Sequence, residues 1–69
     1  MKKVIILVPV FNDWESLTKL INEISITIED IKNYEFKCII INDSSSIQRP
    51  KILHPKNMKS LRIINMKVN

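Results

Sequence analysis

The sequence predicts a small α/β unit in which a strand, a helix and two more strands build a three-stranded parallel sheet with one main helix. Two apolar, β-branched runs flank a segment whose apolar residues recur at helical spacing, and a third such run follows later. A strand that returns through a helix to a neighbouring strand lies parallel to it, because the crossover brings the chain back to the same edge. The 69 residues are expected to form one unit, residues 1–69, with marginal stability.

The first strand is predicted over Val4–Val10, which is an uninterrupted apolar run. Such runs are typical of parallel strands that are buried on both faces of a sheet, so we expect both faces of this strand to be covered. Pro9 has no backbone N–H to donate to a neighbouring strand, and the strand is therefore expected to end near it.

The helix is predicted from about Asp13 to about Asp30. Asn12 is a favourable N-cap, and Glu15 follows it at the spacing of a capping box. Trp14 is expected to pack the helix against the sheet. The apolar residues that recur at helical spacing are Leu17, Leu20, Ile21, Ile24 and Ile28.

The second strand is predicted over Phe36–Ile41 and the third over residues 61–66. Cys38 lies inside the second run and is expected to be a buried, unreactive strand residue. Residues 47–60 contain two prolines and show no clear period, which predicts an irregular connection. His54, in this connection, is expected at the surface, because no acidic or thiol partner is near it in the sequence.

Composition excludes several classes of function. The formal net charge is +4, but the lysines are scattered and no basic stripe with interleaved aromatic residues appears, so no nucleic-acid partner is expected. Glycine is absent, which excludes both the Gly-rich dinucleotide-binding loop and the P-loop. A single cysteine forms no internal disulfide, and no apolar run is long enough for a membrane span, so a cytoplasmic protein is expected.

Polar residues follow the first two strands, at Pro9 to Asp13 and at Asn42 to Ser46. Ligands of open α/β sheets bind at the carboxyl ends of the strands, where these two clusters should lie side by side. The ring of Phe11 offers a stacking face to a nucleobase, and the carboxylates of Asp13 and Asp43 can accept from a base N–H or a ribose hydroxyl. The parts of a nucleoside pocket are therefore present without glycine.

Each of these residues also has a purely structural interpretation. Asn12 is explained as an N-cap alone, and Asp13 as a complement to the helix dipole. Phe11 could belong to the core at the end of its strand. Asp43 could stabilise a turn, and Ser44 to Ser46 are typical turn formers. The sequence leaves these alternatives open.

Three segments resemble the start of the family two glycosyltransferases: Val-Ile-Ile-Leu-Val-Pro-Val-Phe-Asn-Asp (4–13), Ile-Ile-Ile-Asn-Asp-Ser-Ser (39–45) and Leu-Arg-Ile-Ile-Asn-Met-Lys-Val-Asn (61–69). Members of that family are inverting enzymes with a GT-A (Rossmann-like) fold. Their first strand ends in Pro-x-Tyr-Asn-Glu or a close variant, and their second in Asp-Asp-Gly-Ser or Asn-Asp-Gly-Ser. The resemblance implies a partial GT-A unit that binds the nucleotide of a UDP-, GDP- or other NDP-sugar donor.

The resemblance transfers five nucleotide-sugar-binding positions to this chain. Pro9 matches the proline whose neighbourhood cups the base. Phe11 matches a tyrosine that lies against the base, and it lacks that residue's hydroxyl. Asp13 matches an acidic residue that contacts the nucleotide in some members. Ile41 matches a backbone contact, and Asp43 matches the more constant aspartate of the second motif, a ligand of the base or ribose.

Two departures and two omissions accompany this resemblance. Asn42 replaces the first aspartate of the second motif, and Ser44 replaces its glycine. In the family, the Asp-x-Asp motif that holds Mg²⁺ or Mn²⁺ and the catalytic base both come later in the chain than position 69. The resemblance therefore implies a portion truncated before Asp-x-Asp, with no catalytic residue and no metal ligand of its own, while the full-length family is expected to use Mg²⁺ or Mn²⁺.

Three hypotheses follow. The first is the donor half-site of an enzyme that transfers a sugar to an acceptor hydroxyl. A full-length form of this enzyme would be cytoplasmic or, alternatively, membrane-peripheral. The second is a small, non-catalytic α/β module that binds a nucleotide or a partner. The third, a response-regulator-like unit, fits poorly, because the expected acidic pair after the first strand is absent. The truncation implied by the resemblance has a physical consequence. The first strand, which is interior in the family sheet, is expected here to be an exposed, apolar edge, so that the chain is poorly soluble or associates with another chain through this edge.

Overall fold

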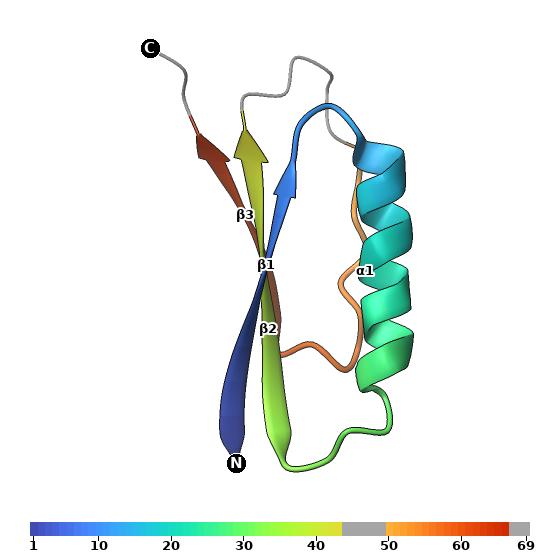
Figure 1. The fold of residues 1–69 in the computed structure, drawn as a ribbon, viewed down its shortest axis with the longest axis vertical. Coiled ribbons are helices and arrows are strands. Elements are labelled where there is room, and N and C mark those ends of the chain that lie inside the picture. The colour runs from blue at the N-terminus through green and yellow to red at the C-terminus, as the bar shows by residue number, and fades with distance from the viewer. Residues whose placement is uncertain (44–49, 67–69) are drawn as a thin grey trace.

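The computed structural model describes residues 1–43 and 50–66 and contains the four elements in the predicted order (Figure 1). They are β1 (Lys2–Val10), α1 (Trp14–Ile28), β2 (Tyr34–Asp43) and β3 (Ser60–Met66). All neighbouring strands are parallel, and the order in the sheet is β1-β2-β3. The predicted α/β class, the three-stranded parallel sheet and the single main helix are confirmed, and β1 lies at an edge of this sheet.

The core lies on one face of the sheet. Alternate residues of β1 and β2 are buried there, because successive side chains of a strand point to opposite faces. Figure 1 shows α1 and residues 50–59 on this same side of the sheet. Trp14 and Cys38 are buried, as predicted. The buried apolar residues of the core are Val8, Val10, Trp14, Leu17, Ile21, Ile28, Phe36, Cys38, Ile40 and Met58.

The opposite face of the sheet is not covered by any described segment, so the prediction that the first strand is buried on both faces was wrong. Ile5 is 59% exposed and Leu7 is 64% exposed. The physical reason is that α1 and residues 50–59 both pack on the other side. We call this uncovered surface the bare face. Its apolar members, identified by strand alternation and register, are Ile5, Leu7, Pro9, Ile39, Ile41, Ile64 and Met66.

The N-terminus of α1 begins one residue later than predicted. Asp13, not Asn12, is the N-cap, and its carboxylate accepts from the backbone N–H of Ser16 at 3.2 Å. Asn12 instead has a φ of 60°, and the N–H of Asp13 donates to the carbonyl of Phe11 at 2.7 Å across it. Asparagine is the residue other than glycine that best tolerates this left-handed region. The predicted capping box is therefore wrong, because its first residue forms the turn.

Residues 50–59 return along α1 and are attached to it by one side chain. Asn57 accepts from the hydroxyl of Ser25 at 2.9 Å and donates to the carbonyl of Ser25. Met58 is buried beside this contact, and the N–H of Lys59 donates to the carbonyl of Phe36 at 2.7 Å just before β3 begins. His54 is exposed, as predicted, and its Nε2 lies 2.6 Å from the carbonyl of Met58.

Candidate functional site

The two strand-end clusters lie next to each other, as predicted. In the register of β1 and β2, Pro9 is opposite Ile41 and Val10 is opposite Asn42. Phe11 and the residues that follow it therefore leave the sheet beside the last residue of β2, Asp43. Ser44 to Ser46, the predicted turn formers, lie outside the described residues.

Phe11 lies at the surface, directly after β1. Its side chain is 62% exposed, which excludes the alternative that it fills the core. The tight turn centred on Asn12 directs the chain away from the sheet here and back into α1. A left-handed asparagine costs some conformational energy, and positions of this kind occur preferentially at functional sites. The aromatic ring is thus available to a ligand at the carboxyl edge of the sheet.

Asp13 has a demonstrable structural role. It is exposed, and its Oδ1 accepts from the N–H of Ser16 in the first turn of α1. This bond satisfies one of the backbone donors that a helix leaves unpaired at its N-terminus. Asp13 therefore has a structural role, as the N-cap that was predicted for Asn12, and a contact with a ligand would have to be made by the same carboxylate.

Asp43 and Ile41 belong to the bare face. Asp43 is exposed at the end of β2, opposite Met66 of β3. Asn42, which lies between Ile41 and Asp43 in the sequence, points to the other face and donates from Nδ2 to the Oδ1 of Asn65 at 2.9 Å. Sequence reasoning missed Asn65. Its place near the end of the third apolar run, directly after an Ile-Ile pair as in the case of Asn42, was the signal that could have identified it.

The predicted residues divide into two groups. A hollow of about 180 Å³ at the β1 edge is lined by Pro9, Phe11 and Asp13, together with side chains of α1 that include Ser16 and Leu20. Ile41 and Asp43 do not line it. Drug-sized ligands are usually held in cavities of about 300–1,000 Å³. This hollow could therefore enclose only part of a nucleotide, and the remainder would extend over the sheet edge.

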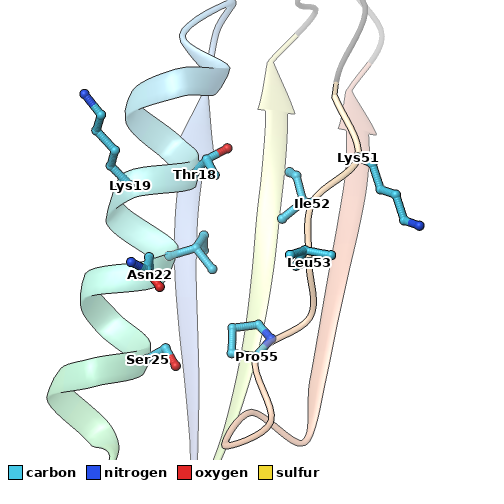
Figure 2. A pocket seen from close by; sticks show the side chains of 9 residues that line it. Thr18, Lys19, Asn22, Ser25, Lys51, Ile52, Leu53 and Pro55 are labelled. Carbon is cyan, nitrogen blue, oxygen red and sulfur yellow. The ribbon is translucent and has the colours of Figure 1, made fainter.

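A larger groove of about 430 Å³ runs between α1 and residues 51–55 (Figure 2). Its polar groups are not directed at a common ligand. The Thr18 hydroxyl donates to the carbonyl of Trp14 at 2.8 Å, and Ser25 is bonded to Asn57. In Figure 2, the side chains of Lys19 and Lys51 extend away from the groove. We therefore interpret it as a packing groove, which shares no lining residue with the hollow at the strand ends.

Burial raises the pKa of the Cys38 thiol, which keeps it protonated. Residues 1–43 and 50–66 contain no cluster of three or more potential metal ligands. In the same part of the chain, no helix is long and apolar enough to cross a membrane.

The sequence matches no protein-family model, and comparisons with curated proteins and with solved structures gave no match.

Proposed function

We propose that this chain is the donor-nucleotide half-site of a glycosyltransferase with a partial GT-A unit, binding the nucleotide of an NDP-sugar. The observation that supports the proposal best is the β1–β2 register, in which Val10 lies opposite Asn42. Because of this register, an exposed aromatic ring at Phe11 and an exposed carboxylate at Asp43 follow neighbouring positions at the carboxyl edge of a parallel sheet. Parallel α/β sheets bind their ligands at this edge.

The roles of the residues follow from their chemistry. The ring of Phe11 provides a stacking face for the base, which is worth about 1–3 kcal/mol in nucleic-acid systems. Asp43 accepts hydrogen bonds from a base N–H or from ribose hydroxyls. Pro9 and Ile41, opposite each other in the register, form the apolar surface between these two groups. Asp13 contributes negative charge beside the hollow while it caps α1.

Catalysis is not assigned to any residue of this chain. The 69 residues contain no Asp-x-Asp sequence, and in the enzymes that the chain resembles this motif holds the Mg²⁺ or Mn²⁺ that stabilises the diphosphate leaving group. Nucleotide binding by this chain is therefore expected to be weak and independent of metal. The second candidate function, a non-catalytic partner-binding module, is favoured by the bare face, because large exposed apolar patches mark interaction surfaces.

The test is a titration of the isotope-labelled chain with UDP and with GDP, with and without Mn²⁺, followed by two-dimensional NMR. We expect amide shifts at residues 9–13 and 41–43, and the same dissociation constant with and without the metal. Phe11→Ala should weaken binding roughly 5- to 100-fold, which is the loss of one stacking contact. Asp43→Ala should abolish measurable binding.

Asp30→Ala is the matched control, since Asp30 is an exposed carboxylate just beyond the other end of α1. It should leave the affinity unchanged. If neither nucleotide shifts any amide, the proposal for this chain is wrong. If binding occurs but Asp30→Ala weakens it as much as Asp43→Ala does, the carboxylate acts only through net charge and the site is misplaced.

A further inference from the structure

The bare face is an exposed apolar surface, most of which the nucleotide site does not explain. Its apolar side chains come from all three strands, and those at the two edges are strongly exposed, led by Leu7 on β1 and including Ile64 on β3. Parallel sheets occur almost only with both faces covered, because their strands are apolar on both sides. On this sheet, α1 and residues 50–59 cover one face only. The second cover is therefore expected from outside the described chain.

One end of the bare face carries three cations, Lys3, Lys37 and Arg62, and one carboxylate, Glu35, and this excess of positive charge favours a partner with negative charge. Lys37 stands opposite Ile5 on β1 and Ser60 on β3. Arg62 stands opposite Ile39, two register positions further along and therefore on the same face, and is exposed. Within residues 1–43 and 50–66, the single ion pair joins Lys19 to Glu15 on α1, so neither Lys37 nor Arg62 forms an ion pair with a described residue.

We propose that the bare face docks an amphipathic α-helix of a partner protein, with carboxylates on the flank that lies over Lys37 and Arg62. The width of the face fits one helix: three strands about 4.8 Å apart span about 10 Å between their outer axes, close to the diameter of a helix. The opposite face gives an internal standard, because α1, with 15 residues, packs there together with residues 50–59. A partner helix of similar length, about 22 Å, would cover the apolar rows.

A second copy of this chain fits the same face less well. The rows from Lys37 to Asp43 measure about 23 Å by about 14 Å, a footprint of about 330 Å². Stable specific interfaces bury about 800 Å² on each partner, more than twice this footprint, so the face is too small for a stable dimer and suits the weaker, transient docking of one helix. A face-to-face dimer would also press the bulky side chains of two twisted sheets against each other, whereas a single helix can lie along the concave line of one twisted sheet.

The experiment uses the full chain and two designed helical peptides of 18 residues, which share one leucine stripe and differ at two flank positions, Glu in one and Lys in the other. Binding is measured by fluorescence anisotropy at low salt. We expect the Glu peptide to bind at least tenfold more tightly, because charges at the margin of a docked helix are only partly screened. Lys37→Glu combined with Arg62→Glu should reverse this preference. Leu7→Gln should weaken both peptides at least fivefold.

Ile26→Gln is the matched control, because Ile26 is 62% exposed, almost the same as Leu7, but lies on α1. It should leave both affinities unchanged. Equal affinity for the two peptides would overturn the charge argument, and equal weakening by Ile26→Gln and Leu7→Gln would overturn the location. Sedimentation velocity gives the remaining outcome: a micromolar dimer that Leu7→Gln separates would assign the bare face to a second copy and overturn the proposal.

Discussion

Three consecutive isoleucines in β2, Ile39, Ile40 and Ile41, provide a direct test of the one-sided core. Ile40 is fully buried under α1, whereas its two neighbours point to the bare face and are only partly buried. We consider the substitution of each by valine. Valine keeps the β-branch and therefore the strand preference, so each substitution removes one methylene and reports on burial alone.

The expected effects follow from what each methylene contacts. Ile→Val in a core typically costs about 0.5–1.5 kcal/mol, and Ile40 should lie in the upper half of that range because its side chain has no access to solvent. At Ile39 and Ile41 the removed methylene loses only part of its burial, so the cost should stay below about 0.5 kcal/mol. A chain of 69 residues has a total stability of roughly 3–10 kcal/mol, so all three variants should fold.

The assay is urea unfolding followed by far-ultraviolet circular dichroism at low micromolar concentration. With a slope of about 1 kcal/mol per molar urea, Ile40→Val should lower the midpoint by about 1 M, and the other two variants by less than about 0.5 M. Equal shifts for all three variants would refute the reasoning, since they would mean that both faces of β2 are equally buried in the folded chain.

Three further results are expected. Burial raises the pKa of the Cys38 thiol, so the unfolded chain loses its thiol proton at a lower pH than the folded chain does. The contribution of this group to stability should be intact below about pH 8.5 and should fall as the pH rises above it. In urea midpoints measured from about pH 7 to 9.5, Cys38→Ala should remove this fall in stability. Asn57→Ala should cost about 1–2 kcal/mol by the same assay, because it breaks both bonds to Ser25; an unchanged midpoint would mean that residues 50–59 are not held by this side chain. Asn33 has a φ of 69°, so Asn33→Ala should cost about 1 kcal/mol in thermal unfolding while Asn33→Gly should not; equal losses would contradict the left-handed backbone.

Much of the fold is predictable from the sequence because local periodicity and strand order carry the information. The alternation of buried and exposed side chains within Val4–Val10 is not predictable in the same way. A continuous apolar run has the same residue types whether its second face is covered by the same chain or by another chain, because only burial itself favours apolar residues. The sequence therefore predicts that a cover is needed and does not predict that Ile5 and Leu7 lack one in the described structure.

The candidate site shows a second kind of limit. Its location at two strand ends follows from parallel topology, and the adjacency of Pro9 and Ile41 needs only the register. The choice of N-cap does not follow, because Asn12 and Asp13 are both good caps and adjacent in the sequence. The left-handed turn at Asn12 decides between them, and a chain without glycine uses asparagine where such a turn is required.

The two proposals meet at Pro9 and Ile41, which belong both to the bare face and to the nucleotide site. From Lys37 to Ile41 is four residues, about 13 Å, so a helix of about 22 Å anchored over Lys37 and Arg62 would reach this pair. A docked helix would then lie over part of the nucleotide site, so the two ligands are expected to change each other's affinity. By thermodynamic linkage, any factor by which the helix changes nucleotide affinity must equal the factor by which the nucleotide changes helix affinity. Arg62→Glu acts on the helix and Phe11→Ala, which lies beyond the end of β1, acts on the nucleotide, so they separate direct loss of binding from loss of this coupling.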